Sequence, residues 1–275
     1  MSIADEWLQA IHSLNERAAL PRVRAVHVPQ DPEPGKRSSF CAVELEGSAT
    51  GLAYIALEGT RERLFQLDLQ ALAGADPLQL AAGFATQDGA ARVLGFATLN
   101  ALARWLFDRS GFEPPHSRDS LGGIVPEAGG RIGMVGLFEP LVQRIRDAGA
   151  HLTVLELPPR PEVESPGYRL SHDPAQLREC SQVLCTSTVL LNDSFESLRA
   201  QCSAANVFVL IGPGASCLPD PLFTRGVTRL AGSWVLDPAG VFDALATGRS
   251  WSEHARKFEL APQDYPGFEA LLARL

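Results

Sequence analysis

One segment near the middle of the chain, residues 131–158, limits the possible folds more than any other. Its first apolar run breaks at Gly133 and Gly136 and leads directly into an amphipathic helical pattern, and a second apolar run ends on an acid, Glu156. A strand, a glycine turn, a helix, a second strand and an acid about twenty residues past the glycines form the order of a dinucleotide-binding βαβ unit. Because only two glycines are present instead of three, the segment predicts a fold more firmly than it predicts a nucleotide.

The rest of the C-terminal half continues this alternation. Strands are expected at 152–155, 182–186, 207–211 and 234–236, and helices at 140–148, 174–180, 193–201 and 238–247. Alternating strands and helices build a parallel sheet that is covered on both faces. We therefore expect an α/β domain with a parallel sheet over residues 116–275.

The N-terminal half has a different pattern. A helix at 7–18 and a strand at 23–28 precede a β-hairpin, in which every second residue from Cys41 is apolar. Helical stretches follow at 63–73, after the Asp76 cap, and at 90–108. The last is apolar on nearly all sides and should lie in the middle of its domain. Strands followed by helices predict a smaller α+β domain over residues 1–115, joined to the second through a Gly- and Pro-rich linker at 111–130.

Composition narrows the classes of partner and compartment. A chain of 275 residues accommodates about two domains. Its net charge of −8 opposes binding to the phosphate backbone of nucleic acid. We expect no membrane span, because no apolar run reaches roughly 18 residues. Five scattered cysteines and an acidic, amphipathic start favour reduced thiols and a cytoplasmic location. The edge hairpin and the apolar first helix make a homodimer plausible.

The candidate binding residues lie where the predicted parallel strands end, because ligands of open parallel sheets collect there, at the point where the strand order reverses. They are Gly133, Gly136 and Phe138 after the first strand, Glu156 after the second, Thr186, Ser187 and Thr188 with Asn192 after the third, and Gly212, Pro213 and Gly214 after the fourth. We expect these loops to border one cleft.

Each candidate has a second interpretation. Gly133 and Gly136 could expose backbone N–H groups to an anion at an uncapped helix start, or could only allow tight packing of helix on strand. Glu156 could accept a hydrogen bond from a ribose hydroxyl or simply be solvated. The Thr186 to Thr188 hydroxyls could orient a polar ligand or cap the helix from Asp193.

Two further features bear on the cleft. The Gly212-Pro213-Gly214 turn is stiff and poor in side chains, which favours ligand contact. Asn100 is the one polar interruption in the apolar helix, and a buried amide must find partners, either within its own domain or in the cleft.

The motifs do not identify a reaction. The six histidines are dispersed, and no CxxC, HxxxH or HExxH spacing occurs, so the sequence does not favour a preformed metal cage. No serine nucleophile elbow or Walker loop is present either.

The chain resembles the heavy-metal chelation family of bacterial and archaeal proteins of unknown function. The matching stretches are residues 95–101, 133–141, 188–196 and 210–214, continuing through 221–223, 226–227, 231–232 and Asp237. The resemblance as a whole covers roughly residues 15 to 250. Ser187 and Ser194 stand where the resemblance leads us to expect glycine and threonine.

The resemblance implies an enolase N-terminal-like first domain, a Rossmann-like second domain and a shared pocket. The residues it places in that pocket are Asn100, Gly136, Phe138, Thr188, Asn192, Gly212, Pro213 and Gly214. It also implies a role in handling heavy metals.

These observations lead to two hypotheses of function, beside a structural or regulatory role in which the cleft is vestigial. The first is binding of a small polar or anionic ligand in the interdomain cleft, with a heavy-metal ion or a metal-containing metabolite as the implied cargo, contacts from the backbone N–H groups of Gly136 and Gly214, and hydrogen bonds from Thr188 and Asn192. The alternative is an enzyme that uses a nucleotide-type cofactor, with Glu156 on the ribose. The sequence identifies neither the ligand nor any catalytic residue.

Overall fold

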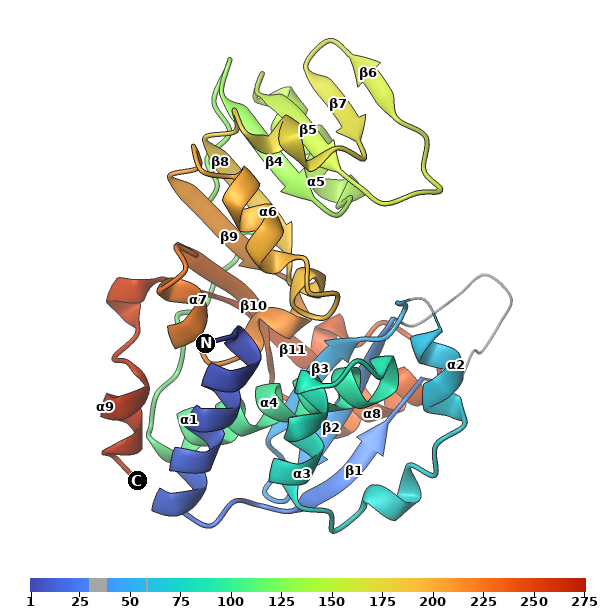
Figure 1. Cartoon of the computed structure of the whole chain (residues 1–275), viewed down its shortest axis with the longest axis vertical. Helices are drawn as coiled ribbons and strands as arrows, with labels where there is room; N and C mark the ends of the chain where they lie inside the picture. The colour runs from blue at the N-terminus through green and yellow to red at the C-terminus, as the bar shows by residue number, and fades with distance from the viewer. Residues whose placement is uncertain (30–38, 58) are drawn as a thin grey trace.

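The computed structural model describes residues 1–29, 39–57 and 59–275, and these contain a three-stranded and an eight-stranded sheet. The small sheet and the helices α1 to α4 lie at one end of the molecule, and strands β4 to β7 lie at the other (Figure 1). Within the described residues, no helix has the length and apolar character that a membrane crossing requires.

The N-terminal elements follow the expected order. They are α1 (Ile3–Arg17), β1 (Val23–His27), β2 (Phe40–Leu45), β3 (Thr50–Tyr54), α2 (Thr60–Phe65), α3 (Pro77–Ala82) and α4 (Gly89–Arg109). The helix expected at 63–73 is interrupted, because Asp68 accepts the amides of Gln70 and Ala71 and starts a separate 3-10 turn, Gln70–Leu72. As predicted, α4 is buried on nearly all sides.

The small sheet is covered on both faces. Sheet order is β1-β2-β3, with both pairings antiparallel. Gly51 of β3 touches α4, since a Cβ there would come within 2.1 Å of the Ala97 carbonyl oxygen. On the other face, Ala42 and Leu52 pack with Val241 of α8 (Pro238–Ala246), a helix from the C-terminal half. The hairpin is therefore not isolated, because α8 covers its second face at Ala42 and Leu52.

The large sheet carries the C-terminal half. Its strands are β4 (Arg131–Val135), β5 (His151–Leu155), β6 (Val163–Ser165), β7 (Tyr168–Ser171), β8 (Gln182–Thr186), β9 (Val207–Ile211), β10 (Arg229–Val235) and β11 (Ala255–Leu260). The order is β11-β10-β9-β8-β4-β5-β7-β6, parallel from β10 to β7 and antiparallel at both edges. The remaining helices are α5 (Glu139–Asp147), α6 (Phe195–Gln201), α7 (Asp220–Phe223) and α9 (Phe268–Leu272). These observations confirm a parallel-sheet α/β fold with a smaller α+β part.

Some predicted elements differ from the observed ones. The helix expected at 174–180 is a 3-10 turn, Pro174–Leu177, that Asp173 caps. The strand expected at 234–236 is the end of the longer β10, and the helix expected from Asp193 begins only at Phe195. The strands β6, β7 and β11 were not predicted. The strand β6 is largely exposed, and β7 and β11 contain charged residues such as Arg169 and Lys257, so that none of the three forms an apolar run.

Residues 111–130 lie against the large sheet. The Ser117 amide donates to the Lys257 carbonyl, and the Glu259 amide donates to the Pro115 carbonyl. Leu121 and Ile124 are buried in the core on that face of the sheet. The Gly- and Pro-rich composition thus reflects an irregular path with fixed contacts along β11.

Candidate functional site

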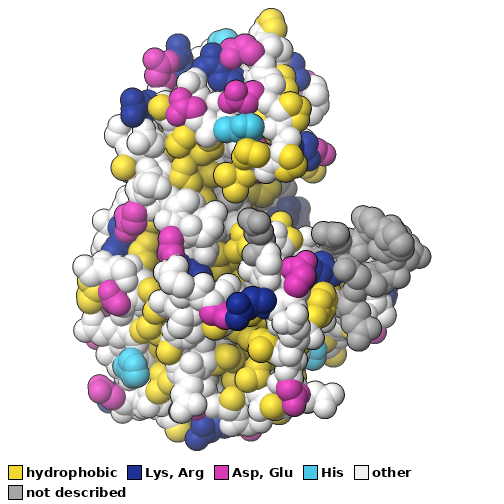
Figure 2. Space-filling model, turned by 45° about the vertical axis from the view of Figure 1, so that its right-hand side comes forward, with side chains coloured by type: hydrophobic (Ala, Val, Ile, Leu, Met, Phe, Trp, Pro, Cys, Tyr) yellow, Lys and Arg dark blue, Asp and Glu magenta, His cyan; other side chains and the backbone are white. Residues whose placement is uncertain are grey.

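A cavity of about 640 Å³ lies at the carboxyl ends of β4, β5, β8 and β9. Phe40, Tyr54, Ala56 and Leu57 of the hairpin region form its wall on the side of the small sheet. Apolar side chains gather on the surface at the level where the two ends of the molecule meet (Figure 2). Residues from both halves of the chain therefore share this cavity.

The position of the cavity follows from the sheet order. From β4, the chain places β5 and β7 on one side and β8, β9 and β10 on the other. The crevice between the ends of β4 and β8 is therefore the point where the strand order reverses. Open parallel sheets bind their ligands at this point.

Most of the predicted site residues line the cavity. Those that do are Gly136, Phe138, Glu156, Thr186, Ser187, Thr188, Asn192, Gly212 and Pro213. Asn100, Gly133 and Gly214 do not belong to its lining. The loops that the sequence placed at strand ends therefore converge, whereas these three residues lie elsewhere.

Gly133 and Gly136 have different surroundings. A Cβ on Gly133 would lie 3.0 Å from Leu177 and 3.2 Å from Val183, so this glycine allows close packing. Gly136 has a φ of +81° and lies against Thr186, 3.1 Å from where its Cβ would be. Its N–H group donates to the Leu155 carbonyl at 2.9 Å. The expectation that the Gly136 amide contacts a ligand is therefore not met.

Glu156 occupies the position where the sequence suggested a bound anion. Its Oε2 accepts the Leu137 N–H at 2.7 Å, and its Oε1 accepts the Leu157 N–H at 2.8 Å. The carboxylate thus connects the loop after β4 to the loop after β5. A carboxylate at the start of α5 also matches the positive end of the helix dipole.

The hydroxyl residues after β8 are ordered by their own hydrogen bonds. Thr186 Oγ1 accepts the Thr188 amide at 3.2 Å and donates to Thr188 Oγ1 at 3.0 Å. Thr186 therefore caps the 3-10 turn Ser187–Leu190, and not α6. The Thr188 hydroxyl keeps its own proton available for another acceptor.

Asn192 presents its amide nitrogen. Its Oδ1 accepts from both the amide (3.2 Å) and the hydroxyl (2.6 Å) of Ser194. Its Nδ2 makes no hydrogen bond in the part of the chain that the structure describes, and the residue lines the cavity. Asn192 can therefore donate to a ligand.

A buried arginine from α4 fixes the loop that carries Asn192. Arg92, 8% exposed, pairs with Asp193 and donates to the Leu190 carbonyl at 3.2 Å. Its guanidinium lies 4.8 Å from the centre of the Phe84 ring. Asp193 has a φ of +57°, a conformation that few side chains adopt. The N-terminal half thus holds one wall of the cavity in place.

Asn100 and Gly214 lie in the packed core next to the cavity. Asn100 is fully buried, and its Nδ2 donates to the Leu52 carbonyl at 2.8 Å, which matches the interpretation of bonding within the N-terminal half. Its Oδ1 has no partner among the described residues. A Cβ on Gly214 would lie 2.9 Å from Ser187 Oγ and 3.0 Å from Phe96, so Gly214 permits these contacts.

Several lining residues were not predicted from the sequence. Phe40 and Tyr54 come from the hairpin, Ser194 and Ser197 from the start of α6, and His172 from the loop after β7. Burial, and the nearby charge of Glu156, raise the pKa of the Tyr54 phenol. The alternation of apolar and polar residues in the hairpin predicts strands but does not show that Phe40 and Tyr54 face the large sheet. Only the three-dimensional arrangement shows this.

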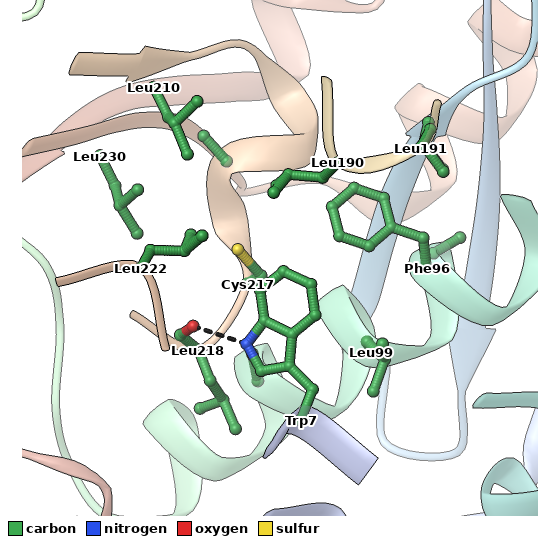
Figure 3. Packing of buried hydrophobic residues seen from close by; sticks show 14 of the residues in the cluster. Trp7, Phe96, Leu99, Leu190, Leu191, Leu210, Cys217, Leu218, Leu222 and Leu230 are labelled. Atoms are coloured by element: carbon green, nitrogen blue, oxygen red, sulfur yellow. Dashed lines mark hydrogen bonds between the residues drawn. The ribbon is translucent and has the colours of Figure 1, made fainter. Parts of the chain in front are cut away.

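The described residues do not form a metal cage. They contain no group of three His, Cys, Asp or Glu side chains placed to hold an ion. All five cysteines are free and buried, and burial raises the pKa of Cys41 and Cys217 to about 12 and of Cys202 to about 11. Figure 3 shows Cys217 inside the apolar core, beside Trp7, whose indole donates to the Leu218 carbonyl at 2.9 Å. Thiolates that would bind a soft metal are thus not available at the surface.

Comparison with known proteins identifies a family. The model of a family described as "Putative heavy-metal chelation" (DUF364) matches residues 124–262. A structure of a family member of unknown function from Desulfitobacterium hafniense superposes with a TM-score of 0.71 at 19% identity, covering 95% of this chain and 100% of that one. A second, from Pyrococcus horikoshii, gives a TM-score of 0.65 at 18% identity, covering 93% and 99%. A search of curated proteins finds no match.

Proposed function

The chain belongs to this heavy-metal chelation family, and on that premise we propose that the cavity between its two halves binds a small polar molecule. The observation that carries the proposal is the convergence of the loops after β4, β5, β8 and β9 with the hairpin on one cavity of about 640 Å³. Ligand pockets in proteins commonly have volumes of about 300–1,000 Å³ and mainly apolar walls with a few polar groups. This cavity has both properties.

If the ligand contains a heavy metal, we propose that the metal enters the cavity as a complex with a small organic chelator. Glu156 and His172 are the lining side chains, among those described, that commonly ligate metals. Glu156 already accepts two amides, and His172 Nε2 lies 2.8 Å from the Arg160 carbonyl. A bare ion would therefore find few free ligands, whereas a coordinated metal could bind through the groups of its organic chelator.

The hydrogen-bonding groups come from the loop after β8. The Thr188 hydroxyl and the Asn192 amide nitrogen are the donors that we assign to ligand recognition. Phe138 and the hairpin residues supply apolar walls. The nucleotide-type cofactor receives less support from this geometry, because the carboxylate expected at the ribose is engaged by the Leu137 and Leu157 amides.

Thermal unfolding with a panel of probes tests the proposal. The panel contains divalent metals, complexes of these metals with the neutral chelator ethylenediamine, NAD, S-adenosylmethionine and ATP. A probe at a hundred times its dissociation constant should stabilise the protein by about 2.7 kcal/mol. We expect a metal–chelator complex to stabilise the protein more than the bare metal or the free chelator does.

Matched variants locate the site. Asn192→Ala should weaken the stabilising effect of the metal–chelator complex, because a ligand donor is lost. Asn206→Ala makes the same chemical change at an exposed position outside the cavity lining and should leave it intact. If both variants respond like the wild type, Asn192 does not contact the ligand. If no probe stabilises the wild type, the proposed binding function is not supported.

A further inference from the structure

The carboxylate of Glu156 changes which ligands the cavity favours. A glycine turn before a helix normally presents free amides to an anion. Here the Gly136 amide donates to Leu155, and the Leu137 amide donates to Glu156 at 2.7 Å. The protein therefore supplies its own anion at this turn, and an external phosphate or carboxylate would be repelled by it.

The other described lining residues carry no charge that would neutralise this carboxylate. Among the described lining residues, Glu156 is the one carboxylate, and there is no arginine or lysine. The net charge of the whole chain is −8. Unbalanced negative charge in a cleft with apolar walls attracts cations and raises their local concentration.

Aromatic rings stand around the same space. Phe40 and Tyr54 line it from the hairpin and meet edge to face, with ring centres 5.6 Å apart, and Phe138 lines it from the loop after β4. The faces of aromatic rings carry partial negative charge and attract organic cations. The negative charge of Glu156 also reaches Tyr54, since it contributes to raising the pKa of that phenol.

Together, the carboxylate and the aromatic walls lead us to propose that the ligand of this cavity is a small molecule with a positive charge on an apolar body. The charged group lies near Glu156, and its apolar part contacts Phe40, Tyr54 and Phe138. This inference rests on the proposed function and names the class of ligand. It replaces our expectation, drawn from the sequence, that an anionic ligand would also be accepted.

A pair of isosteric probes tests the charge requirement. Choline and 3,3-dimethylbutan-1-ol have nearly the same shape and differ in charge. In calorimetric titrations of the full chain, choline should bind at least about tenfold more tightly, because a charge close to an ion of opposite sign contributes more than a factor of ten to affinity. Hexaamminecobalt(III) shows whether a cationic metal complex is accepted as well, and sulfate serves as the anionic probe.

Variants of Glu156 and Phe138 separate the contribution of the carboxylate to ligand selectivity from that of the aromatic wall. Glu156→Gln should reduce the preference for choline to about onefold, while Glu16→Gln, the same change at an exposed position on α1, should leave it unchanged. Phe138→Leu keeps the carboxylate and an apolar wall, and should weaken choline binding severalfold by removing the ring. This second variant tests the inference even if Glu156→Gln fails to fold.

The outcomes distinguish the inference from the proposed function. Equal affinity for the two isosteres, or tighter binding of sulfate, would overturn the cation requirement and leave the binding function standing. Absence of choline binding would also overturn the cation requirement. The binding function itself is tested separately, by stabilisation with the metal–chelator probe.

Discussion

At the scale of single residues, Glu156 and Gly133 make contacts between segments that are far apart in the chain, Glu156 with Leu137 and Gly133 with Leu177. Glu156 was recognised as the acid after the second strand, but its partners are the Leu137 amide in the loop after β4 and the Leu157 amide in the loop after β5. Spacing along the chain cannot show this, because the two amides belong to loops that meet only after β4 and β5 pair. Gly133 was likewise found at a special position, but its neighbour Leu177 comes from a segment more than forty residues later.

Gly51 allows the closest approach between the small sheet and α4. A Cβ there would lie 2.1 Å from the Ala97 carbonyl oxygen and 2.3 Å from the Ala101 nitrogen, both backbone atoms that move only with the helix. We expect Gly51→Ala to lower the free energy of unfolding by about 3 kcal/mol or more, as overpacking does when the backbone must shift. Gly47→Ala, in open space at a φ of +84°, should cost about 1 kcal/mol. Equal losses in urea denaturation would contradict this.

His27 should contribute to the acid sensitivity of the fold. It stacks on Phe242 with ring centres 3.7 Å apart, and burial lowers its pKa below 6.5 although the Glu44 charge opposes this shift. The unfolded chain then binds a proton more readily than the folded one, so stability should be fully present above about pH 6.5 and fall as the pH decreases below it. His27→Gln should reduce this loss in denaturation experiments between pH 7.5 and 5.5. An unchanged pH profile would show that His27 does not cause it.

At the scale of elements, periodicity predicted most helices and strands, and exposure explains those that it missed. The apolar α4 and the central strands β4, β8 and β9 gave strong patterns because they are buried on nearly all sides. The short β6 and the charged β11 lie at the sheet edges and have no such pattern, and β7 has none because it contains Arg169 and Ser171. The hairpin pattern was recognised, but its second covered face was not, since α8 comes from nearly two hundred residues later.

The proposed domain boundary after residue 115 can be tested by expressing residues 1–115 alone. We expect this fragment to lack a cooperative fold. In the full chain, Trp7 bonds to Leu218, and Ala42 packs with Val241 from the second half. Without these partners, a large apolar surface of the small sheet and of α1 would face water. Near-ultraviolet circular dichroism and thermal unfolding provide the measurement. A cooperative transition would show that the first half is an independent unit.

At the scale of the whole molecule, the site depends on the reversal of strand order at β4. The sequence predicted the strand ends and the loops that follow them, and the rule for parallel sheets predicted that these loops would meet. The sequence could not predict that Phe40 and Tyr54 of the hairpin form a wall of the cavity, because their position there depends on how the two halves of the chain pack. The homodimer remains a prediction, which sedimentation equilibrium would test.

The central claim is that the ligand occupies the cavity between the two halves. Ala56 lies exposed at its wall, so Ala56→Trp should fill the space without disturbing the core, while Ala71→Trp places the same side chain at a distant exposed position. The most direct measurement is the calorimetric affinity for choline in these two variants. We predict that Ala56→Trp abolishes binding and that Ala71→Trp preserves it. Binding of wild-type strength in the Ala56→Trp variant would show that the ligand lies elsewhere.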